Sequence, residues 1–540
     1  VDGELWVGNQ TGATGELNFT AGSLTTNSWG LVGRKDDANT GAGAVGTVSM
    51  SGGTWTKTGE SNLIVGDTGD GTMDMTGGLV EVVPHPTVER GITWVGNRND
   101  CTGQLSISGS AEWRSEAFTV GVEGGAVGML DLDGGTVRTS RIVGGAGTST
   151  VNFNGSQIIA SGDQAEFMAF LTTANVADGD LRVDTNGFEL TATQVLSGTG
   201  DVVKSGEGVL RLTGANTYSG DNIVNGGTLL VSVGSTGGGD FVVADGAGMG
   251  VFQGDGTSTL SVPNLTLGST GGASVLIDLG DAFGNPVAAP LEVTGNLTLN
   301  GPVAVDIEDL EPEVGSFTLI SYSGPKSGSG SFELGRLPNG VSATLSDDGA
   351  GTVTLEITDI TFPSWTGNVD GVWDTTIENW EDLLTFTPIT YTDPAPVVFG
   401  DFGFETAVTL DITVAPADVL FENGSLDYSL TGSGKITGST GLRKTGGGAL
   451  EIATQNDFTG EVVLGGGEVS IASMSNAGSP SPLGAGSSPV VLSGSVLNFT
   501  GATGATDRGL AINAGSALVT TEGELSFGGP VTCDNGSLVK

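Results

Sequence analysis

The chain has 540 residues, and 95 of them are glycine, about two and a half times the share in an ordinary globular protein. This excess predicts a turn-rich fold of short strands and disfavours long helices. With 18 Lys and Arg against 62 Asp and Glu, the formal net charge is −44. That charge excludes nucleic acid and anionic membranes as partners, because affinity for phosphate groups comes from clustered Lys and Arg.

A Val-Gly dipeptide recurs through the first 160 residues, with spacings of 25, 33, 30, 25 and 23 residues. Each copy predicts a short strand that ends in a tight turn. The six copies are Val7-Gly8, Val32-Gly33, Val65-Gly66, Val95-Gly96, Val120-Gly121 and Val143-Gly144.

A second predicted strand follows each Val-Gly and alternates strictly between apolar and polar residues, which is the pattern of a strand with one buried face. Its inner pairs are Leu17/Phe19, Val48/Met50, Met73/Met75, Leu105/Ile107, Leu130/Leu132 and Val151/Phe153. The polar residues between them are Asn18, Ser49, Asp74, Ser106, Asp131 and Asn152. Because no copy buries enough apolar surface to fold alone, the copies must stack on one shared column.

A third predicted strand completes each copy after a glycine turn, near Trp55, Val80, Val137 or Ile158. Three strands and three turns in about 25 residues predict one coil of a right-handed parallel β-helix, an all-β β-solenoid. Residues 34–44 and 83–91 are then extended loops, which is where binding usually sits.

Residues 163–172 break the strand pattern. Asp163 can cap a first helical turn with Glu166 three residues later, and Phe167, Phe170 and Leu171 share one helical face. We therefore expect a short helix here that covers a seam of the solenoid.

Residues 196–231 and 436–471 carry one motif twice, 240 residues apart and without a gap. Nine positions are identical, among them Lys204/Lys444 and Asn216/Asn456. The motif runs Gly-x-Gly, Lys-x-Gly-x-Gly, Leu-x-Leu-x-Gly-x-Asn-x-Tyr-x-Gly and Gly-Gly-x-Leu, and it resembles the autotransporter-associated β-strand repeat, also called the passenger-associated transport repeat. The second copy departs from it with Phe458 in place of Tyr218.

The resemblance implies the parallel β-helical passenger region of a large bacterial protein that is secreted or displayed on the outer surface. We divide the chain accordingly into a solenoid of six Val-Gly repeats (1–162), a solenoid with the first motif (163–309), a closing β-sheet (310–358), a linker and module start that carries Trp365, Trp373 and Trp380 (359–400), and a second solenoid with the second motif (401–540), which we expect to continue beyond residue 540.

Few residues suit catalysis. His85 is the one histidine and lies in a proline-flanked loop, which excludes a Ser-His-Asp arrangement elsewhere and a multi-histidine metal site. The adjacent acids Asp36-Asp37 and Asp347-Asp348 are interpreted as solvated turn residues.

We predict no catalytic, cofactor-binding or metal-binding residues and no cofactor. The alternative is weak Ca²⁺ binding by the outward-facing Asp74, Asp131 and Asp133.

Two functional hypotheses follow. The first is a structural or adhesive extracellular rod, which is not an enzyme; the alternative is a carbohydrate-active β-helix enzyme, a polysaccharide lyase or hydrolase. An enzyme needs carboxylates that converge with Arg or Lys in one groove, whereas the predicted outward column mixes Asn, Ser and Asp, as a rod tolerates. Trp6 and Trp94 each precede a Val-Gly. We interpret them as solenoid packing, with stacking on a sugar ring as the alternative.

The expected partners are further copies of the protein in a fibre, or the continuation of a longer chain, together with surface carbohydrate. The last residues, GSLVK (536–540), restart the motif at GDVVK (200–204) and favour such a continuation. No apolar run approaches the roughly 20 residues of a membrane span. Cys101 and Cys533 are expected not to form a disulfide.

Overall fold

The computed structural model is built of strands and turns. It describes residues 3–10, 12–34, 43–84, 91–280, 285–308, 313–338, 340–360, 362–383, 385–512, 515–521, 523–533 and 536–539. Within these ranges there is no helix, and so none that could span a membrane. The chain forms two compact units: unit 1 is Val1–Leu337 with Ala343–Glu356, and unit 2 is Pro338–Ser342 with Ile357–Lys540.

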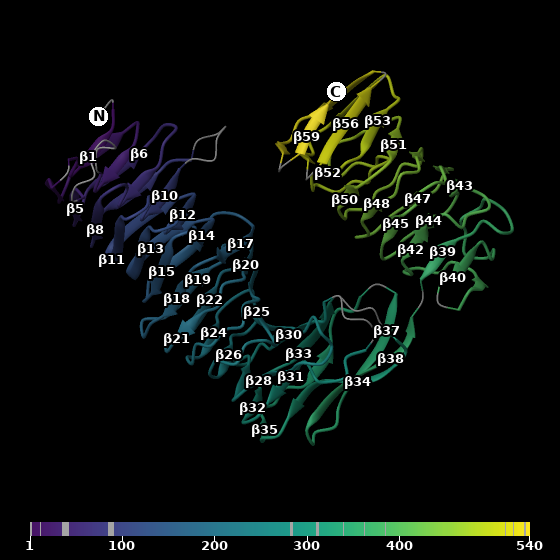
Figure 1. Ribbon diagram of the computed structural model, residues 1–540. Coiled ribbons are helices and arrows are strands. Elements are labelled where there is room, and N and C mark those ends of the chain that lie inside the picture. Colours follow the sequence, from purple (N-terminus) through teal and green to yellow (C-terminus); the bar gives the residue numbers. More distant parts are fainter. Residues whose placement is uncertain are drawn as a thin grey trace. The chain divides into compact units, whose positions relative to one another are not determined.

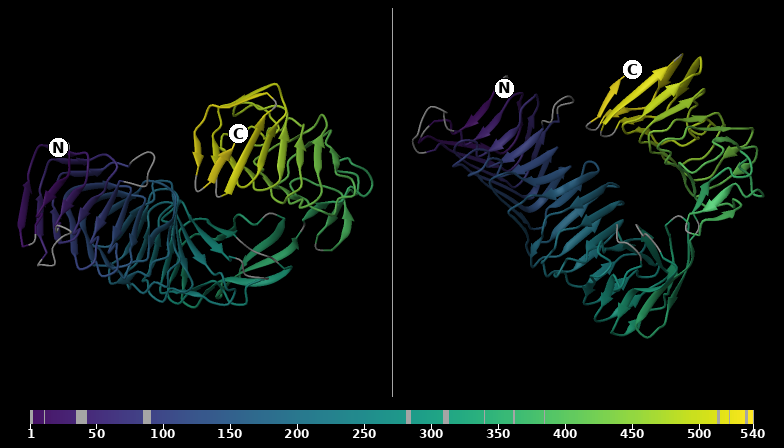
Figure 2. Two further views of the ribbon diagram at one scale, coloured as in Figure 1. Left: turned by 45° about the horizontal axis from the view of Figure 1, so that its top comes forward. Right: turned by 45° about the vertical axis from the view of Figure 1, so that its right-hand side comes forward.

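Unit 1 is a parallel β-solenoid whose coils stack strand on strand (Figures 1 and 2). Its first column contains 14 strands in hydrogen-bonded order. They are β1 (Leu5–Val7), β4 (Gly30–Val32), β7 (Leu63–Val65), β10 (Ile92–Val95), β12 (Ala117–Val120), β14 (Arg141–Gly144), β17 (Gln164–Ala169), β20 (Glu189–Ala192), β23 (Val209–Leu212), β25 (Thr228–Ser232), β27 (Gly248–Phe252), β30 (Ala273–Asp278), β33 (Val303–Glu308) and β36 (Phe332–Leu334).

Two further columns complete the coils. The second contains β2 (Thr14–Phe19), β5 (Val45–Met50), β8 (Asp70–Met75), β11 (Thr102–Ser115), β13 (Val127–Thr139), β15 (Thr148–Phe153), β18 (Thr173–Val176) and β21 (Ser197–Gly198). The third contains β3 (Ser23–Thr26), β6 (Thr54–Lys57), β9 (Leu79–Val82), the later parts of β11 and β13, β16 (Gln157–Ala160), β19 (Leu181–Asp184), β22 (Val202–Ser205), β24 (Asn222–Val224), β26 (Phe241–Val243), β29 (Leu265–Leu267), β32 (Leu297–Leu299) and β35 (Lys326–Ser327).

The register predicted from the alternating second strand is confirmed. Leu105 pairs with Met73 on one side and with Leu130 on the other, and the same parallel register runs from Leu17 to Val151. From Val48 onward every inner side chain is at most 1% exposed. The third strands are also in register, since Trp55, Val80, Val137 and Ile158 occupy one buried row with Trp113.

The predicted helix at 163–172 is wrong. Residues Gln164–Ala169 form strand β17, in which Met168 pairs with Ile142 of β14 and with Ala192 of β20. Phe167 is fully buried, whereas Phe170 has a φ of 60° and is 65% exposed. The first column needs a strand in this coil to continue its hydrogen bonds, and that tertiary requirement overrides the local helical pattern.

A separate sheet of five strands follows the order β28 (Leu260–Val262), β31 (Leu291–Val293), β34 (Gly315–Tyr322), β38 (Thr352–Ile360) and β37 (Val341–Asp347). β28, β31 and β34 pair in parallel, and each belongs to a different coil. In the sequence, each of them follows a strand of the first column and precedes a strand of the third column. The finer segment boundaries proposed at residues 162, 309 and 400 stay predictions.

Unit 2 is also built of stacked parallel strands. One column contains β39 (Pro363–Trp365), β42 (Val397–Phe399), β45 (Val419–Phe421), β48 (Leu442–Lys444), β50 (Val462–Leu464), β52 (Val490–Leu492), β55 (Leu510–Ile512) and β58 (Val531–Cys533), with β40 (Trp380–Asp382) and β41 (Thr387–Ile389) added antiparallel. A second contains β43 (Ala407–Thr409), β46 (Tyr428–Thr431), β49 (Leu450–Ile452), β51 (Glu468–Ile471), β53 (Val496–Phe499), β56 (Gly515–Thr521) and β59 (Gly536–Val539). Two short pairs are β44 (Thr413–Val414) with β47 (Lys435–Ile436), and β54 (Thr503–Thr506) with β57 (Glu524–Phe527).

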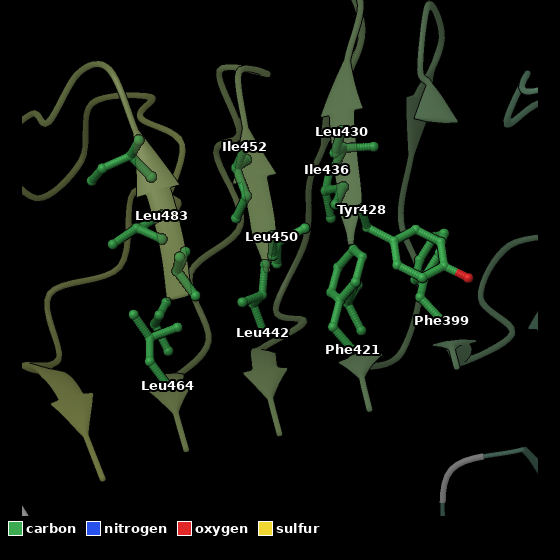
Figure 3. Close-up of a cluster of buried hydrophobic side chains, with 14 of the residues drawn as sticks. Phe399, Phe421, Tyr428, Leu430, Ile436, Leu442, Leu450, Ile452, Leu464 and Leu483 are labelled. Carbon is green, nitrogen blue, oxygen red and sulfur yellow. The ribbon is translucent and has the colours of Figure 1, made fainter. Parts of the chain in front are cut away.

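The core of unit 2 begins with an aromatic cluster. Trp365, Trp373 and Trp380 are fully buried, and the ring centroids of Trp365 and Trp380 lie 5.0 Å apart. Phe399 stacks on Phe421 at 4.4 Å, and the aliphatic core continues along the strands beyond them (Figure 3). The three tryptophans therefore close the apolar interior at the first strands of this unit.

Candidate functional site: an outer-face pocket of the first coils

The turn after each first-column strand depends on its glycine. Gly66 has a φ of +77°, and a Cβ at this position would lie 2.6 Å from the carbonyl oxygen of Thr102. Gly33 has a φ of +73°, and its Cβ would lie 2.1 Å from the carbonyl oxygen of Asp70. Only glycine satisfies both the backbone conformation and the close approach of the next strand, which explains why Val-Gly recurs.

Because the turn is the same in successive coils, the residues that follow its glycine stack on one another. The backbone N–H of Arg34 donates to Gly8 O at 2.9 Å, that of Asp67 to Gly33 O at 3.0 Å, and that of Asn97 to Gly66 O at 2.7 Å. The Val-Gly turns therefore align Arg34, Asp67 and Asn97 in one row on the surface of the solenoid.

Next to this row the structure contains a cavity of about 200 Å³, which we call the outer-face pocket. It lies over β4, β7 and β10, where Leu31, Ile64 and Trp94 occupy successive rungs of one outward-facing row. Leu31 and Ile64 form its floor and are each 2% exposed. Trp29 and Trp94 form its walls, with ring centroids 6.2 Å apart at 46°. The rim is formed by Glu4, Arg34, Asp67, Asn97 and Arg98.

The rim is held by a charge-balanced hydrogen-bond network. Asn97 Nδ2 donates to Asp67 Oδ1 at 2.6 Å, and Arg98 Nε lies 3.7 Å from the same oxygen. Arg34 Nη1 lies 3.5 Å from Glu4 Oε2. The same guanidinium lies over the Trp6 ring, with Cζ 4.5 Å from the ring centroid. Each guanidinium therefore has a carboxylate partner. An apolar floor, aromatic walls and a few oriented polar groups are the features of a small-ligand site.

The packing role predicted for Trp6 and Trp94 requires a correction. Trp6 is 40% exposed and Trp94 is partly exposed, because both occupy the outward position of a strand whose neighbouring Val7 and Val95 are buried. Trp6 and Trp94 are thus surface aromatics, and Trp94 belongs to the pocket. Sequence reasoning missed Trp29, Arg34, Asp67, Asn97 and Arg98. The available signal was that a polar residue follows each of the first four Val-Gly copies.

A second cavity, of about 170 Å³, is lined by Glu81, Arg114, Glu116 and Arg138 on the third column. Carboxylates and arginines do converge here, as the enzyme alternative requires. Arg114, however, pairs with Glu112 at 2.9 Å and with Glu81 at 3.5 Å. The hydrogen bond from Arg114 lowers the pKa of Glu112. A general acid in glycoside cleavage needs the opposite shift, so this network fits a structural role.

Two of the three acids considered for Ca²⁺ accept hydrogen bonds from side-chain amides. Asp131 accepts from Asn152 at 2.7 Å and from Gln104 at 3.3 Å, and Asp133 accepts from Asn154. Asp74 lies two rungs from Asp131 in the same outward row. Across the described ranges no three His, Cys, Asp or Glu side chains gather as a metal site.

The remaining residues singled out from the sequence fall into two groups. His85, Asp36 and Asp37 lie outside the described residues. Asp347 pairs with Lys326 and accepts from Tyr322 at 2.8 Å, while Asp348 accepts three backbone N–H groups of residues 350–352. Asp348 is therefore a turn residue, as interpreted, but Asp347 belongs to an ion pair.

Cys101 and Cys533 are free thiols in the structure, and the absence of a disulfide between them stays a prediction. Cys101 is buried and donates to Gly66 O at 3.4 Å. Burial raises its pKa to about 11, which makes it a poor nucleophile at neutral pH.

The doubled motif places a fully buried lysine at the same point of each copy. Lys204 Nζ donates to the carbonyl oxygens of Ser205 at 2.9 Å, Gly206 at 2.7 Å and Gly226 at 2.9 Å. Lys444 Nζ makes the matching bonds to Thr445 and Gly446, at 2.5 and 2.9 Å. Each ammonium thus bonds to its own turn and to the turn of the next coil, where Lys444 Nζ donates to Gly466 O at 3.5 Å.

Residues 202–231 and 442–471 match the family model described as passenger-associated-transport-repeat. The chain therefore contains two passenger-associated transport repeats. Its repeats share a second buried polar position, because Asn216 Oδ1 accepts from Leu196 N and Asn456 Oδ1 accepts from Ile436 N, both at 2.9 Å. The repeat motif therefore encodes the turns between coils as well as the strands.

The repeat protein is also similar to a curated relative named "Adhesin BmaC autotransporter", from Brucella suis biovar 1 (strain 1330). The two sequences are 28% identical over 444 residues, which is 78% of this chain and 12% of the relative. The chain thus spans about an eighth of the length of that relative.

Proposed function

We propose that this chain is an extracellular, cell-surface segment of a passenger protein that acts as an adhesive rod. The observation that carries the proposal is the first column of unit 1, in which 14 strands stack without a break. Such a stack is a rigid scaffold that displays its turns and outer faces for binding. The passenger-associated repeats and the similarity to a protein named as an adhesin support the same role.

The proposal assigns binding, rather than catalysis, to the outer surface. Both arginines of the second cavity, Arg114 and Arg138, form ion pairs with Glu112, and the hydrogen bond from Arg114 lowers the pKa of Glu112. These features disfavour the alternative of a polysaccharide lyase or hydrolase. Assembly of copies into a fibre remains a prediction, which sedimentation and electron microscopy of the purified chain can test.

The test is an in-frame deletion of the segment encoding residues 1–540 in the source bacterium. Antibodies against the purified chain should label intact wild-type cells and not the deletion strain. The deletion should lower attachment of cells to a panel of surfaces, and added purified chain should compete with wild-type attachment. Labelling only after cell lysis, or unchanged attachment of the deletion strain, would overturn the proposal.

A further inference from the structure

We propose that the outer-face pocket binds one neutral pyranose ring. The inference rests on the proposed adhesive function and names the ligand class of that surface. It also assigns the contacts: Trp29 and Trp94 face the apolar C–H side of the ring, and the row formed by Asp67, Asn97 and Arg98 binds its hydroxyl groups.

The size of the pocket limits the ligand to a single ring. Its volume of about 200 Å³ is below the roughly 300–1,000 Å³ of pockets that take drug-sized molecules. The floor of Leu31 and Ile64 is shielded from solvent, each being 2% exposed, although both side chains belong to the outward row. The two indoles, tilted by 46° to one another beside this floor, provide aromatic surface that the C–H face of a pyranose can contact.

The charge of the pocket indicates a neutral ligand. Two carboxylates and two guanidiniums form its rim, and they are paired as Arg34 with Glu4 and Arg98 with Asp67. The pocket therefore has no excess positive charge with which to hold an anion. The chain as a whole carries a formal charge of −44, which repels acidic sugars further.

The hydrogen-bonding groups suit vicinal hydroxyls, each of which both donates and accepts. Asp67 Oδ1 accepts a hydrogen bond from Asn97 Nδ2 and lies 3.7 Å from Arg98 Nε. We assign its Oδ2 as acceptor from one hydroxyl and the guanidinium of Arg98, whose side chain is 53% exposed, as donor to the next. The backbone bond of Asn97 to Gly66 and that of Asp67 to Gly33 fix this row before any ligand binds, which lowers the entropic cost of binding.

The test is saturation-transfer NMR with the purified 540-residue chain, using D-glucose, D-galactose, D-mannose and N-acetyl-D-glucosamine as neutral probes and D-glucuronate as the acidic probe. We expect at least one neutral sugar to bind with a dissociation constant on the order of 1 mM, as its size allows, and more tightly than glucuronate. Trp94→Ala and Asp67→Asn should each weaken binding at least tenfold. Thr119→Ala, one rung further along the same outward row, is the matched control and should bind as wild type.

Absence of binding by all four neutral sugars would overturn the inference, as would tighter binding of glucuronate or unchanged affinity in folded Trp94→Ala and Asp67→Asn. Circular dichroism verifies that the variants fold. The adhesive function fails separately: a chain that competes for cell attachment but binds no sugar refutes only the pocket assignment. Wild-type chain that binds sugar without any effect on attachment refutes only the adhesive role.

Discussion

Replacing Lys204 by methionine tests the idea that the buried ammonium joins two coils of the repeat. Methionine keeps the length and apolar stem of the side chain but donates no hydrogen bond. The substitution removes the donor from three carbonyl oxygens, two in the turn after β22 and one at Gly226 in the next coil.

The magnitude follows from two opposing effects. A buried acceptor left without a partner costs roughly 1–3 kcal/mol, whereas removal of a buried charge returns part of its desolvation cost. Ser205 O keeps the hydrogen bond from Thr185 N at 3.0 Å, but Gly206 O and Gly226 O both lose this donor, so the loss dominates. We expect the free energy of local opening around residues 196–231 to fall by about 2–4 kcal/mol.

Hydrogen exchange followed by mass spectrometry measures this opening coil by coil, which suits a solenoid that need not unfold in one step. The control is Lys326→Met, which removes the ion pair between Lys326 and Asp347. Because the Lys326 side chain is 26% exposed, this substitution should change local stability by less than about 1 kcal/mol. Unchanged protection of peptides from 196–231 in Lys204→Met would refute the reasoning.

Three further predictions follow from the same structure. Burial lowers the pKa of Lys204 to about 8 from 10.5, so between these pH values the unfolded chain binds more protons than the folded chain, and the contribution of Lys204 to stability rises with pH. The difference in stability between wild type and Lys204→Met, measured from exchange rates corrected for pH, should therefore grow from about pH 7 to about pH 10. A difference that shrinks over this range would contradict the lowered pKa. Leu105→Asp should cost more than about 4 kcal/mol because it buries an unpaired charge. Ser106→Asn on the outward side, where the neighbouring rungs hold Asp74 and Asp131, should stay within about 1 kcal/mol; equal denaturation midpoints of the two variants would show that the register is wrong. Gly66→Ala should lower the free energy of unfolding by more than about 1 kcal/mol, because it combines a positive φ with a 2.6 Å clash. Gly124→Ala, with nothing within 4 Å of its Cβ, is the control in thermal denaturation. Equal losses of stability in the two variants would contradict the role given to the turn.

The coil architecture could be predicted from the sequence because its signals are local and repeated. The alternation at Leu105, Ser106 and Ile107 sets which face is buried, and the same alternation in six copies sets the register between coils. The glycine of each Val-Gly marks the turn, for the backbone reason seen at Gly66. A second glycine lies close to it in space: a Cβ at Gly71 would lie 2.3 Å from Gly66 N.

Other features depend on neighbours that the sequence does not show. Residues 163–172 have a helical pattern in isolation, but Met168 and Ala169 are bound to β14. The pocket brings together Trp29 and Trp94, which are 65 residues apart in the sequence. Because the loops between the strands differ in length, this spacing does not show that the two residues lie two coils apart. Lys204 was identified only as part of a motif, since lysine is usually a surface residue.

The central claim is that the chain acts by attaching the cell to a surface. The most direct measurement uses fluorescent beads coated with the purified chain and counts their attachment to matrix protein, mammalian cells and polysaccharide gels. The account predicts attachment to at least one of these surfaces well above that of albumin-coated beads, competed by soluble chain and accompanied by no release of cleaved polysaccharide. Attachment equal to albumin on every surface, or cleavage of the gel, would contradict it.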